Sequence, residues 1–400
     1  MNSSTTVLIS GAGIAGPSLA YWLRCRGFVP TVVEQAPGLR DSGGAVDFRG
    51  VQLEVLKRMG ILEAVRASET GMGAEVVIDA DGRPLVSLPS EFFSGEVEIE
   101  RGDLARILYD LTEDTTEYVF GDTITSLTET ADGVDVTFRH GAPRTFDLVV
   151  GADGMHSVVR RLAFGDESGF RKDMGYCYAG FTAPNHLGLD HSGVIYNVPG
   201  RGVLVGSSRD SSRAGVGFIF AAPELTYDRH DQAQQKRIVA DAFAEAGWRT
   251  GELVDLMQDT EDLYFDTLSQ IHMDRWSQGR TVLLGDSAWC AGPGGSGTGL
   301  AMIGAYILAG ELAAARGDHR VAFARYEEQL RPGAKVGQKQ AKGAGPFLAP
   351  RTEKKIRRRN RVYKLLSLRL MAGFFSRMAS GAANAVPVKD YPETAVLVAA

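Results

Sequence analysis

The sequence predicts an α/β protein with a Rossmann-like domain, an inserted mixed β-sheet and a C-terminal helix. Three features indicate this class: a glycine-rich turn between a strand and a helix near the N-terminus, strand-like runs separated by turns over residues 193–220, and a basic helical segment over residues 351–364. The 400 residues suffice for one large or two joined domains. A net charge of -6 argues against nucleic acid as a partner.

The first element is a β-branched run over residues 6–10, which predicts a buried strand leading into a Gly-x-Gly-x-x-Gly turn. Gly11 makes the turn, Gly13 lets the backbone approach a pyrophosphate, and Gly16 lets the next helix pack closely on the strand. A second strand ends at Glu34, an acid placed to accept hydrogen bonds from a ribose 2′-hydroxyl. Because an acid disfavours a 2′-phosphate, this pocket fits FAD or NAD, and the motif alone does not separate the two.

A second Gly-x-Gly-x-x-Gly pattern, at Gly292, Gly294 and Gly297, is not expected to form a second dinucleotide fold. No strand leads directly into it, and no strand with a terminal acid follows. The pattern lies in an uncharged stretch, residues 287–310, that is long enough to cross a bilayer. Its glycines would leave backbone groups unsatisfied in lipid, so we expect only a helix over residues 300–312 and no membrane partner.

Two further segments run from a predicted strand into a polar turn. Residues 153–160 follow a strand over residues 147–150, and Ser157 is a candidate N-cap for the helix that comes next. Residues 285–286 follow a strand over residues 281–284. Either turn alone could be structural, but their order behind the first glycine motif is informative.

In this order the three motifs resemble those of the FAD-dependent aromatic hydroxylases of the p-hydroxybenzoate hydroxylase fold. The resemblance implies that FAD is the cofactor and that NAD(P)H binds transiently as co-substrate. It also implies that the helix beginning near Thr298 points its N-terminus at the flavin pyrimidine edge. The cofactor contacts expected from it come from Gly11, Gly13, Ala15, Gly16, Glu34, Gln35, Arg40, Arg101, Asp153, Gly154, Gly285, Asp286, Gly297, Thr298 and Gly299.

Within this family, residues 43–48 resemble the corresponding segment of the tetracycline-inactivating monooxygenases. Two departures concern the flavin contacts. Gln35 follows Glu34 where the family usually has an arginine, and Arg40 is the nearest basic residue. The loop over residues 286–300 is also shorter than the commonest form and lacks its usual glutamine.

We expect an FAD-binding domain of residues 1–73, 98–172 and 271–345 and a substrate domain of residues 74–97 and 173–270. Within the substrate domain, the sequence predicts a hairpin over residues 74–88, strands over residues 193–220 and a helix over residues 232–246. The strands around residues 196–206 and 215–220 are expected to face the flavin. The substrate contacts expected there are Arg201, Arg209 and Phe218.

Residues 346–400 are expected to form a C-terminal helix and tail. The basic segment over residues 351–364 continues into an apolar helical pattern that ends at Met378. A basic amphipathic helix could lie on a membrane or on nucleic acid, but a bracing helix with a solvated basic face is the favoured interpretation.

No metal site and no covalent nucleophile are expected. The three cysteines, Cys25, Cys177 and Cys290, are far apart and fit a reducing cytoplasm. The seven histidines are not paired at ligand spacing, and His156, although it lies in the second motif, is not assigned to the cofactor. The absence of such groups suits chemistry in which the cofactor supplies the reactive atoms.

The resemblance implies a monooxygenase in which NAD(P)H reduces FAD and O2 forms a C4a-hydroperoxyflavin that hydroxylates a phenolic or polycyclic aromatic substrate. The protein would be a cytoplasmic monomer or homodimer. Two alternatives remain: a flavin-dependent epoxidase or halogenase on the same scaffold, and a non-catalytic flavoprotein that binds an aromatic compound. The halogenase Trp-x-Trp signature is absent from the sequence.

Overall fold

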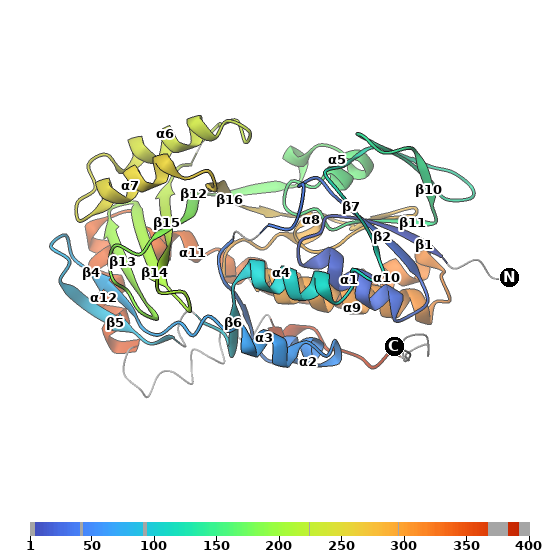
Figure 1. Cartoon of the computed structure of the whole chain (residues 1–400), viewed down its shortest axis with the longest axis horizontal. Coiled ribbons are helices and arrows are strands. Elements are labelled where there is room, and N and C mark those ends of the chain that lie inside the picture. The colour runs from blue at the N-terminus through green and yellow to red at the C-terminus, as the bar shows by residue number, and fades with distance from the viewer. Residues whose placement is uncertain are drawn as a thin grey trace.

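The computed structural model describes residues 5–40, 43–90, 94–223, 225–294, 296–366 and 383–391. Two large sheets lie one beyond the other along the long axis of the molecule, each with its own helices (Figure 1). The N-terminal strands belong to the sheet at the right of the view, and strands from residues 75–88 and 171–271 form the sheet at the left. The predicted fold class is therefore confirmed.

The right-hand sheet has six strands with a parallel centre. Its order is β17 (Ser277–Gln278), β18 (Thr281–Leu283), β11 (Leu148–Gly151), β1 (Thr6–Ser10), β2 (Val29–Glu34) and β7 (Glu117–Phe120). β1 pairs in parallel with both β2 and β11, and α1 (Ala15–Arg24) connects β1 to β2. These strands are almost fully buried, as expected for a parallel sheet covered on both faces. The predicted strand, glycine turn, helix and strand are all present.

The left-hand sheet has seven strands. Its order is β16 (Tyr264–Ile271), β12 (Arg171–Pro184), β15 (Arg213–Ala221), β14 (Arg201–Ser207), β13 (Ser192–Val198), β4 (Glu75–Ile78) and β5 (Pro84–Leu88). The sheet is mixed because β13 and β4 are parallel while the other neighbours are antiparallel. The predicted hairpin over residues 74–88 is therefore one edge of the sheet that the later strands complete.

One face of this sheet is closed by α6 (Gln232–Phe243) and α7 (Thr250–Asp259). Phe218 lies on this closed face, fully buried, with its ring 4.8 Å from that of Phe243 and 6.3 Å from that of Phe181. Side chains alternate along β15, so the neighbours of Phe218 point to the opposite face. This corrects the expectation that Phe218 contacts the substrate: it is a core residue under α6.

Further helices and strands lie around the two sheets. They are β3 (Val46–Phe48), α2 (Val51–Arg58), α3 (Leu62–Ala67), β6 (Val97–Ile99), α4 (Arg101–Asp110), β8 (Ile124–Glu129), β9 (Val134–Phe138), β10 (Arg144–Phe146), α5 (Val158–Phe164), η2 (Glu167–Gly169), α8 (Asp286–Trp289), α10 (His319–Ala341), α11 (Ala344–Leu348), α12 (Glu353–Leu366) and η4 (Ala383–Ala385). α12 corresponds to the predicted basic segment, and the apolar pattern through Met378 lies outside the described residues.

The apolar helix predicted over residues 300–312 is α9 (Gly297–Ala314). It is long and apolar enough to cross a membrane, but 78% of this window is buried inside the fold. α9 packs against α1, α2 and α10. Its hydrophobic surface on all sides is thus explained by burial in the protein core.

Candidate cofactor and active site

In the first glycine motif, two glycines are packed so closely that they have no room for a Cβ atom, and the third borders open space. An ideal Cβ on Gly16 would lie 1.9 Å from the Gly11 carbonyl oxygen, and one on Gly11, where φ is +108°, would lie 2.5 Å from the Ala152 carbonyl oxygen. A Cβ on Gly13 would meet only the Arg101 Nη2 atom, at 3.9 Å. Gly13 therefore leaves a space beside the backbone that a Cβ would enter, as pyrophosphate binding requires.

Glu34, at the end of β2, is fixed against this glycine loop. Its carboxylate accepts hydrogen bonds from the backbone N–H groups of Ala12 at 2.9 Å and Ala36 at 2.8 Å. A carboxylate has further lone pairs, so Glu34 can still accept hydrogen bonds from ribose hydroxyls. Gln35 and Arg40 are exposed beyond the end of β2.

Arg101 is the first residue of α4. Its aliphatic stem lies against Gly43, where an ideal Cβ would come within 2.9 Å of the Arg101 Cδ atom. Its guanidinium points toward Gly13. A cation is thus held beside the open side of the glycine loop, where a pyrophosphate would need one.

The third motif meets the first. Gly285 has φ of +72°, and an ideal Cβ there would lie 3.5 Å from the Ala15 Cβ atom at the start of α1. Asp286 follows as the first residue of α8. Burial raises the pKa of the Asp286 carboxyl, while the charge of Arg101 and a hydrogen bond with the Cys290 thiol lower it. An acid and a cation therefore face the same region from α8 and α4.

The N-terminus of α9 lies next to this pair. Ser296, with φ of +54°, leads into the helix, and an ideal Cβ on Gly299 would lie 2.3 Å from the Gln52 side chain. Gln52 is 2% exposed; its Oε1 atom accepts a hydrogen bond from the Arg49 N–H, and its Nε2 atom has no partner among the described residues. The helix thus presents the backbone groups of Gly297, Thr298 and Gly299 beside an unused amide donor.

The second motif is held together by Asp153. Its carboxylate accepts hydrogen bonds from the N–H groups of Val158 at 2.8 Å and Val159 at 3.1 Å, and from the hydroxyls of Ser10 and Ser157. Ser157 caps α5, as predicted. Burial raises the pKa of the Asp153 carboxyl, and these hydrogen bonds oppose that rise. Asp153 therefore caps the N-terminus of α5 together with Ser157. Gly154, with φ of +80°, has open space around it.

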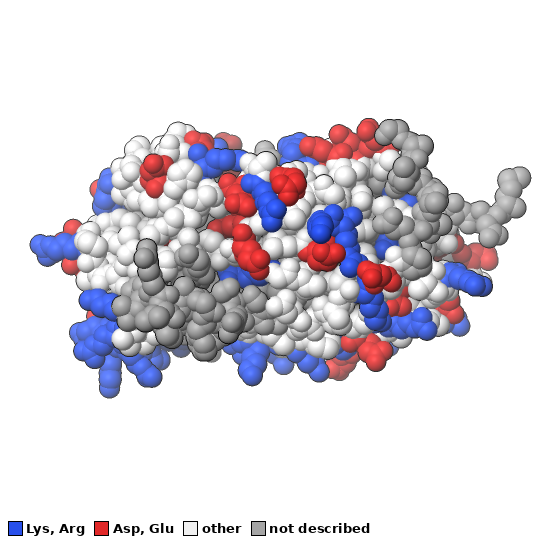
Figure 2. All heavy atoms as spheres, turned by 90° about the horizontal axis from the view of Figure 1, so that it is seen from below, with Lys and Arg blue, Asp and Glu red and all other residues white. Residues whose placement is uncertain are grey.

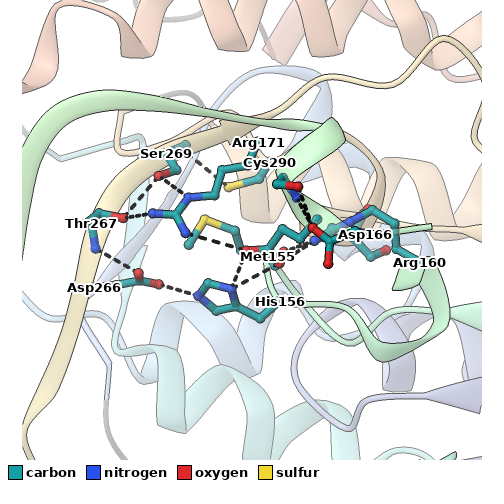
Figure 3. A network of polar contacts seen from close by, with 12 residues as sticks. Met155, His156, Arg160, Asp166, Arg171, Asp266, Thr267, Ser269 and Cys290 are labelled. Atoms are coloured by element: carbon teal, nitrogen blue, oxygen red, sulfur yellow. Dashed lines mark hydrogen bonds and ion pairs between the residues drawn. The ribbon is translucent and has the colours of Figure 1, made fainter. Parts of the chain in front are cut away.

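Arg160 cross-links the second and third motifs from a fully buried position. Its guanidinium donates to the Met155 carbonyl oxygen at 2.5 Å and the Ser287 carbonyl oxygen at 2.9 Å, and it forms an ion pair with Glu167 at 2.7 Å (Figure 3). A buried cation with three acceptors satisfies most of its donors. The spacing of the second motif thus has a structural explanation in these contacts.

His156 joins the two sheets through two carboxylates. Its Nδ1 atom lies 3.0 Å from Glu167, and its Nε2 atom lies 3.0 Å from Asp266 on β16 (Figure 3). Both partners accept hydrogen bonds when ionised, so the protonated imidazolium satisfies both contacts at once. Asp266 also accepts a hydrogen bond from the Tyr227 hydroxyl at 2.8 Å. This role of His156 between the sheets was not predictable from its neighbours in the sequence.

Two tyrosines of the left-hand sheet lie near the pair of charges formed by Arg101 and Asp286. The rings of Tyr178 and Tyr264 are 6.1 Å apart, and neither hydroxyl has a hydrogen bond within the described structure. Tyr264 is 55% exposed, yet surrounding protein raises the pKa of its phenol, and the charges of Arg101 and Asp286 act on it. The Tyr264 ring is therefore accessible to solvent close to these two charges. Sequence analysis missed both tyrosines.

Comparisons with known proteins agree with this geometry. The family model described as FAD binding domain matches residues 4–335. The chain belongs to this FAD-binding family. A flavin-dependent monooxygenase from an unknown prokaryotic organism is 40% identical over 84% of this chain and 89% of its own length, and one from Legionella longbeachae is 37% identical over 85% and 88%. The solved structure of tetracycline destructase Tet(55) is 35% identical, covers 98% of this chain and 100% of its own, and gives a TM-score of 0.84.

The predicted substrate residues of this FAD-binding protein lie in three different places. Arg209 pairs with Asp103 of α4 at 2.7 Å and so lies where the left-hand sheet meets the cofactor side. Arg201 begins β14 at the opposite end of that strand, beside the turn where the Gly200 N–H donates to Pro350. With Phe218 in the core, Arg209 is the predicted residue that contacts α4, the helix that begins at Arg101.

A separate cavity of about 470 Å³ lies on the closed face of the left-hand sheet, beneath α7. Ala183, Val205 and Leu253 are among its lining residues. These residues lie away from the tyrosines and from Arg101, so the cavity is distinct from the cofactor site of this FAD-binding protein. No group of three or more His, Cys, Asp or Glu among the described residues could hold a metal ion.

Proposed function

We propose that this chain is a monooxygenase that uses FAD, NAD(P)H and O2 to hydroxylate an aromatic small molecule. The observation that carries the proposal is the pair of tyrosine hydroxyls, on Tyr178 and Tyr264, that have no hydrogen bond within the described structure and lie near the charges of Arg101 and Asp286. Bound FAD supplies hydride acceptance and oxygen activation, which protein side chains do not provide. The protein contributes binding, orientation and exclusion of water.

The cofactor residues can be assigned from the open positions. We assign the pyrophosphate to the space beside Gly13, with Arg101 as its cation, and the ribose to Glu34. The N-terminus of α9 and the free Nε2 group of Gln52 supply donors for the polar edge of the flavin ring. Asp153 acts through the turn that it holds, and Gly154 offers backbone at that turn.

The substrate face is the side of the left-hand sheet opposite α6. Tyr178, Gly180 and Gly217 share this face, since Gly180 pairs with Gly217 and the Tyr178 ring covers both. The lack of Cβ atoms at Gly180 and Gly217 lets the Tyr178 ring lie close to the backbone, and the rings of Tyr178 and Tyr264 offer stacking surface. The hydroxyls of Tyr178 and Tyr264 then offer hydrogen bonds to phenol or ketone oxygens of the substrate.

The substrate class that we propose is a phenolic or polycyclic aromatic compound. The similar solved structures of Tet(51) and Tet(55), 33% and 35% identical to this chain, are those of tetracycline destructases. Tetracycline is therefore the first compound to test, together with simpler phenols. Two tyrosine rings whose hydroxyls are free to hydrogen-bond offer such molecules both stacking and polar contacts.

The arrangement of the chain supports three further assignments. Residues 1–73, 98–172 and 271–345 form the cofactor-binding unit, and residues 74–97 and 173–270 form the substrate unit. NAD(P)H binds transiently, since the glycine loop before α9 is not followed by a strand of the six-stranded sheet. Three free cysteines suit a reducing cytoplasm.

A compound screen on the purified FAD-loaded protein tests the proposal. NADH or NADPH consumption should accelerate on addition of at least one phenolic or polycyclic compound, and the product should gain one oxygen atom. Tyr264→Ala should weaken this response while FAD stays bound. If compounds bind and quench flavin fluorescence but none accelerates NAD(P)H consumption, the chain is a binding protein and the proposed function is wrong.

A further inference from the structure

α12 has an inner face that braces the left-hand sheet and an outer face that is exposed. Ile356 and Tyr363 point inward and are 8% and 2% exposed. Arg359 also points inward, and its guanidinium donates to Asn197 at 2.6 Å and to the Phe347 carbonyl oxygen at 2.8 Å. These contacts fulfil the bracing role expected from the sequence and fix which side of the helix faces solvent.

The outer face is strongly basic. Five of its side chains are exposed and have no ion pair within the described part of the chain: Lys354, Lys355, Arg357, Arg358 and Arg361. The only acid of α12 is Glu353. Figure 2 shows Lys and Arg gathered at the end of the molecule where α12 lies. The whole chain has a net charge of -6, so this face is a local exception to the overall charge.

Exposed apolar side chains lie among these cations. Val362 is 43% exposed and Leu365 is 63% exposed, the largest exposed fraction among the bulky aliphatic residues described. With Arg358 and Arg361 they occupy positions i, i+3, i+4 and i+7, which places all four on one side of the helix. A surface for nucleic acid would gain little from apolar groups there, whereas an amphipathic surface of this kind fits a lipid interface.

We propose that the outer face of α12 docks the enzyme on a bilayer surface that contains anionic phospholipid. The cations contact lipid phosphates, and Val362 and Leu365 enter the boundary between head groups and acyl chains. Because the rest of the chain is acidic and screening limits attraction to about 8 Å, only this face is drawn to the surface, which sets the orientation of the bound enzyme. This proposal revises the expectation of no membrane partner, because it adds a peripheral contact with a membrane surface. α9 remains a buried core helix and does not cross the membrane.

The test measures co-sedimentation of the FAD-loaded enzyme with vesicles of phosphatidylcholine, with and without phosphatidylglycerol. Binding should require the anionic lipid and fall at high salt. Each cation near an anionic surface contributes about a fivefold gain in partitioning, so Lys355→Gln/Arg358→Gln/Arg361→Gln should lower it about 100-fold. Val362→Ser/Leu365→Ser should lower it without any change in charge.

The matched control removes three exposed cations from α10, as Arg320→Gln/Lys335→Gln/Lys339→Gln, and should bind vesicles like the parent. FAD content and thermal unfolding of every variant report that the fold is intact. The proposal is overturned if the parent does not sediment with anionic vesicles, or if the α10 control loses as much binding as the α12 variant. It is also overturned if duplex RNA binds as tightly as the vesicles and the Val362→Ser/Leu365→Ser variant binds vesicles normally.

Discussion

The contrast between Gly13 and Gly16 gives a sharp test of the cofactor site, because the same one-methyl change should act on different properties. Neither glycine has a positive φ, so alanine brings no left-handed backbone strain at either position. The Cβ of Gly16→Ala would lie 1.9 Å from the Gly11 carbonyl oxygen, which α1 and β1 cannot accommodate without moving apart. The Cβ of Gly13→Ala would enter open space 3.9 Å from Arg101.

The expected magnitudes differ accordingly. Overpacking of this kind costs about 1 to 3 kcal/mol, so Gly16→Ala should lower the free energy of unfolding of the apoprotein by at least that much. Gly13→Ala should leave apoprotein stability within about 0.5 kcal/mol of the parent, as for substitutions away from packed features. Its methyl group would instead separate the pyrophosphate from a backbone N–H donor. The loss of this hydrogen bond costs about 1 to 3 kcal/mol of binding free energy, which weakens FAD binding about 5-fold to 150-fold.

Two measurements on each variant decide the matter: urea unfolding of the apoprotein, and FAD affinity from the quenching of flavin fluorescence. Gly13→Ala should weaken FAD affinity and leave the urea unfolding of the apoprotein unchanged. Gly16→Ala should make the apoprotein unfold at a lower urea concentration. An apoprotein of Gly13→Ala that unfolds like the parent and binds FAD with the parent's affinity would refute the assignment of the pyrophosphate to this loop.

Three further predictions concern other parts of the site. Tyr264→Phe should raise the KM for a phenolic substrate by removing one hydrogen bond, about fivefold for ~1 kcal/mol, and unchanged kinetics would remove Tyr264 from the substrate site. Gly297→Ala, whose Cβ meets only an Asp286 oxygen at 3.5 Å, should shift the flavin reduction potential, and potentiometry showing the parent value would mean that the start of α9 does not touch the ring. Burial lowers the pKa of His156, but hydrogen bonds to Asp266 and Glu167 outweigh burial and raise it above 6.5. The protonated His156 therefore contributes its full stabilisation of the fold below pH 6.5, and this contribution is lost as the pH rises through the pKa of the folded state. The difference in unfolding free energy between parent and His156→Gln should shrink from about pH 5 to about pH 9, and a constant difference would show that this charge does not join the sheets.

The nucleotide half of the fold was predictable because its signals are local. A strand, a glycine turn, a helix and a terminal acid lie within residues 6–34, and Gly16 packs against Gly11 of the same turn. The apolar run that forms most of α9 is a local signal of the same kind. Sequence order then sufficed to bring these elements to one edge of the sheet.

The substrate half was less predictable because strand alternation defines two faces without saying which one faces the cofactor. Phe218 was assigned to the wrong face, which only the packing of α6 reveals. Gly217, which pairs with Gly180 on β12, was a signal for the other face, since small residues mark a surface that something approaches closely, here the Tyr178 ring. Gln52 and Tyr264 reach the site from elements far away in the sequence, so their roles depend on tertiary contacts that no local pattern encodes.

The most direct test of the central claim follows the oxygen atom. The FAD-loaded protein is supplied with NADPH or NADH and with tetracycline and a panel of phenols under isotopically labelled dioxygen, and the products are analysed by mass spectrometry. A monooxygenase that binds its substrate beside Tyr264 should put one labelled oxygen atom into at least one compound, with a matching increase in NAD(P)H consumption. Reduced cofactor consumed only to form hydrogen peroxide, with no labelled product from any compound, would contradict the claim.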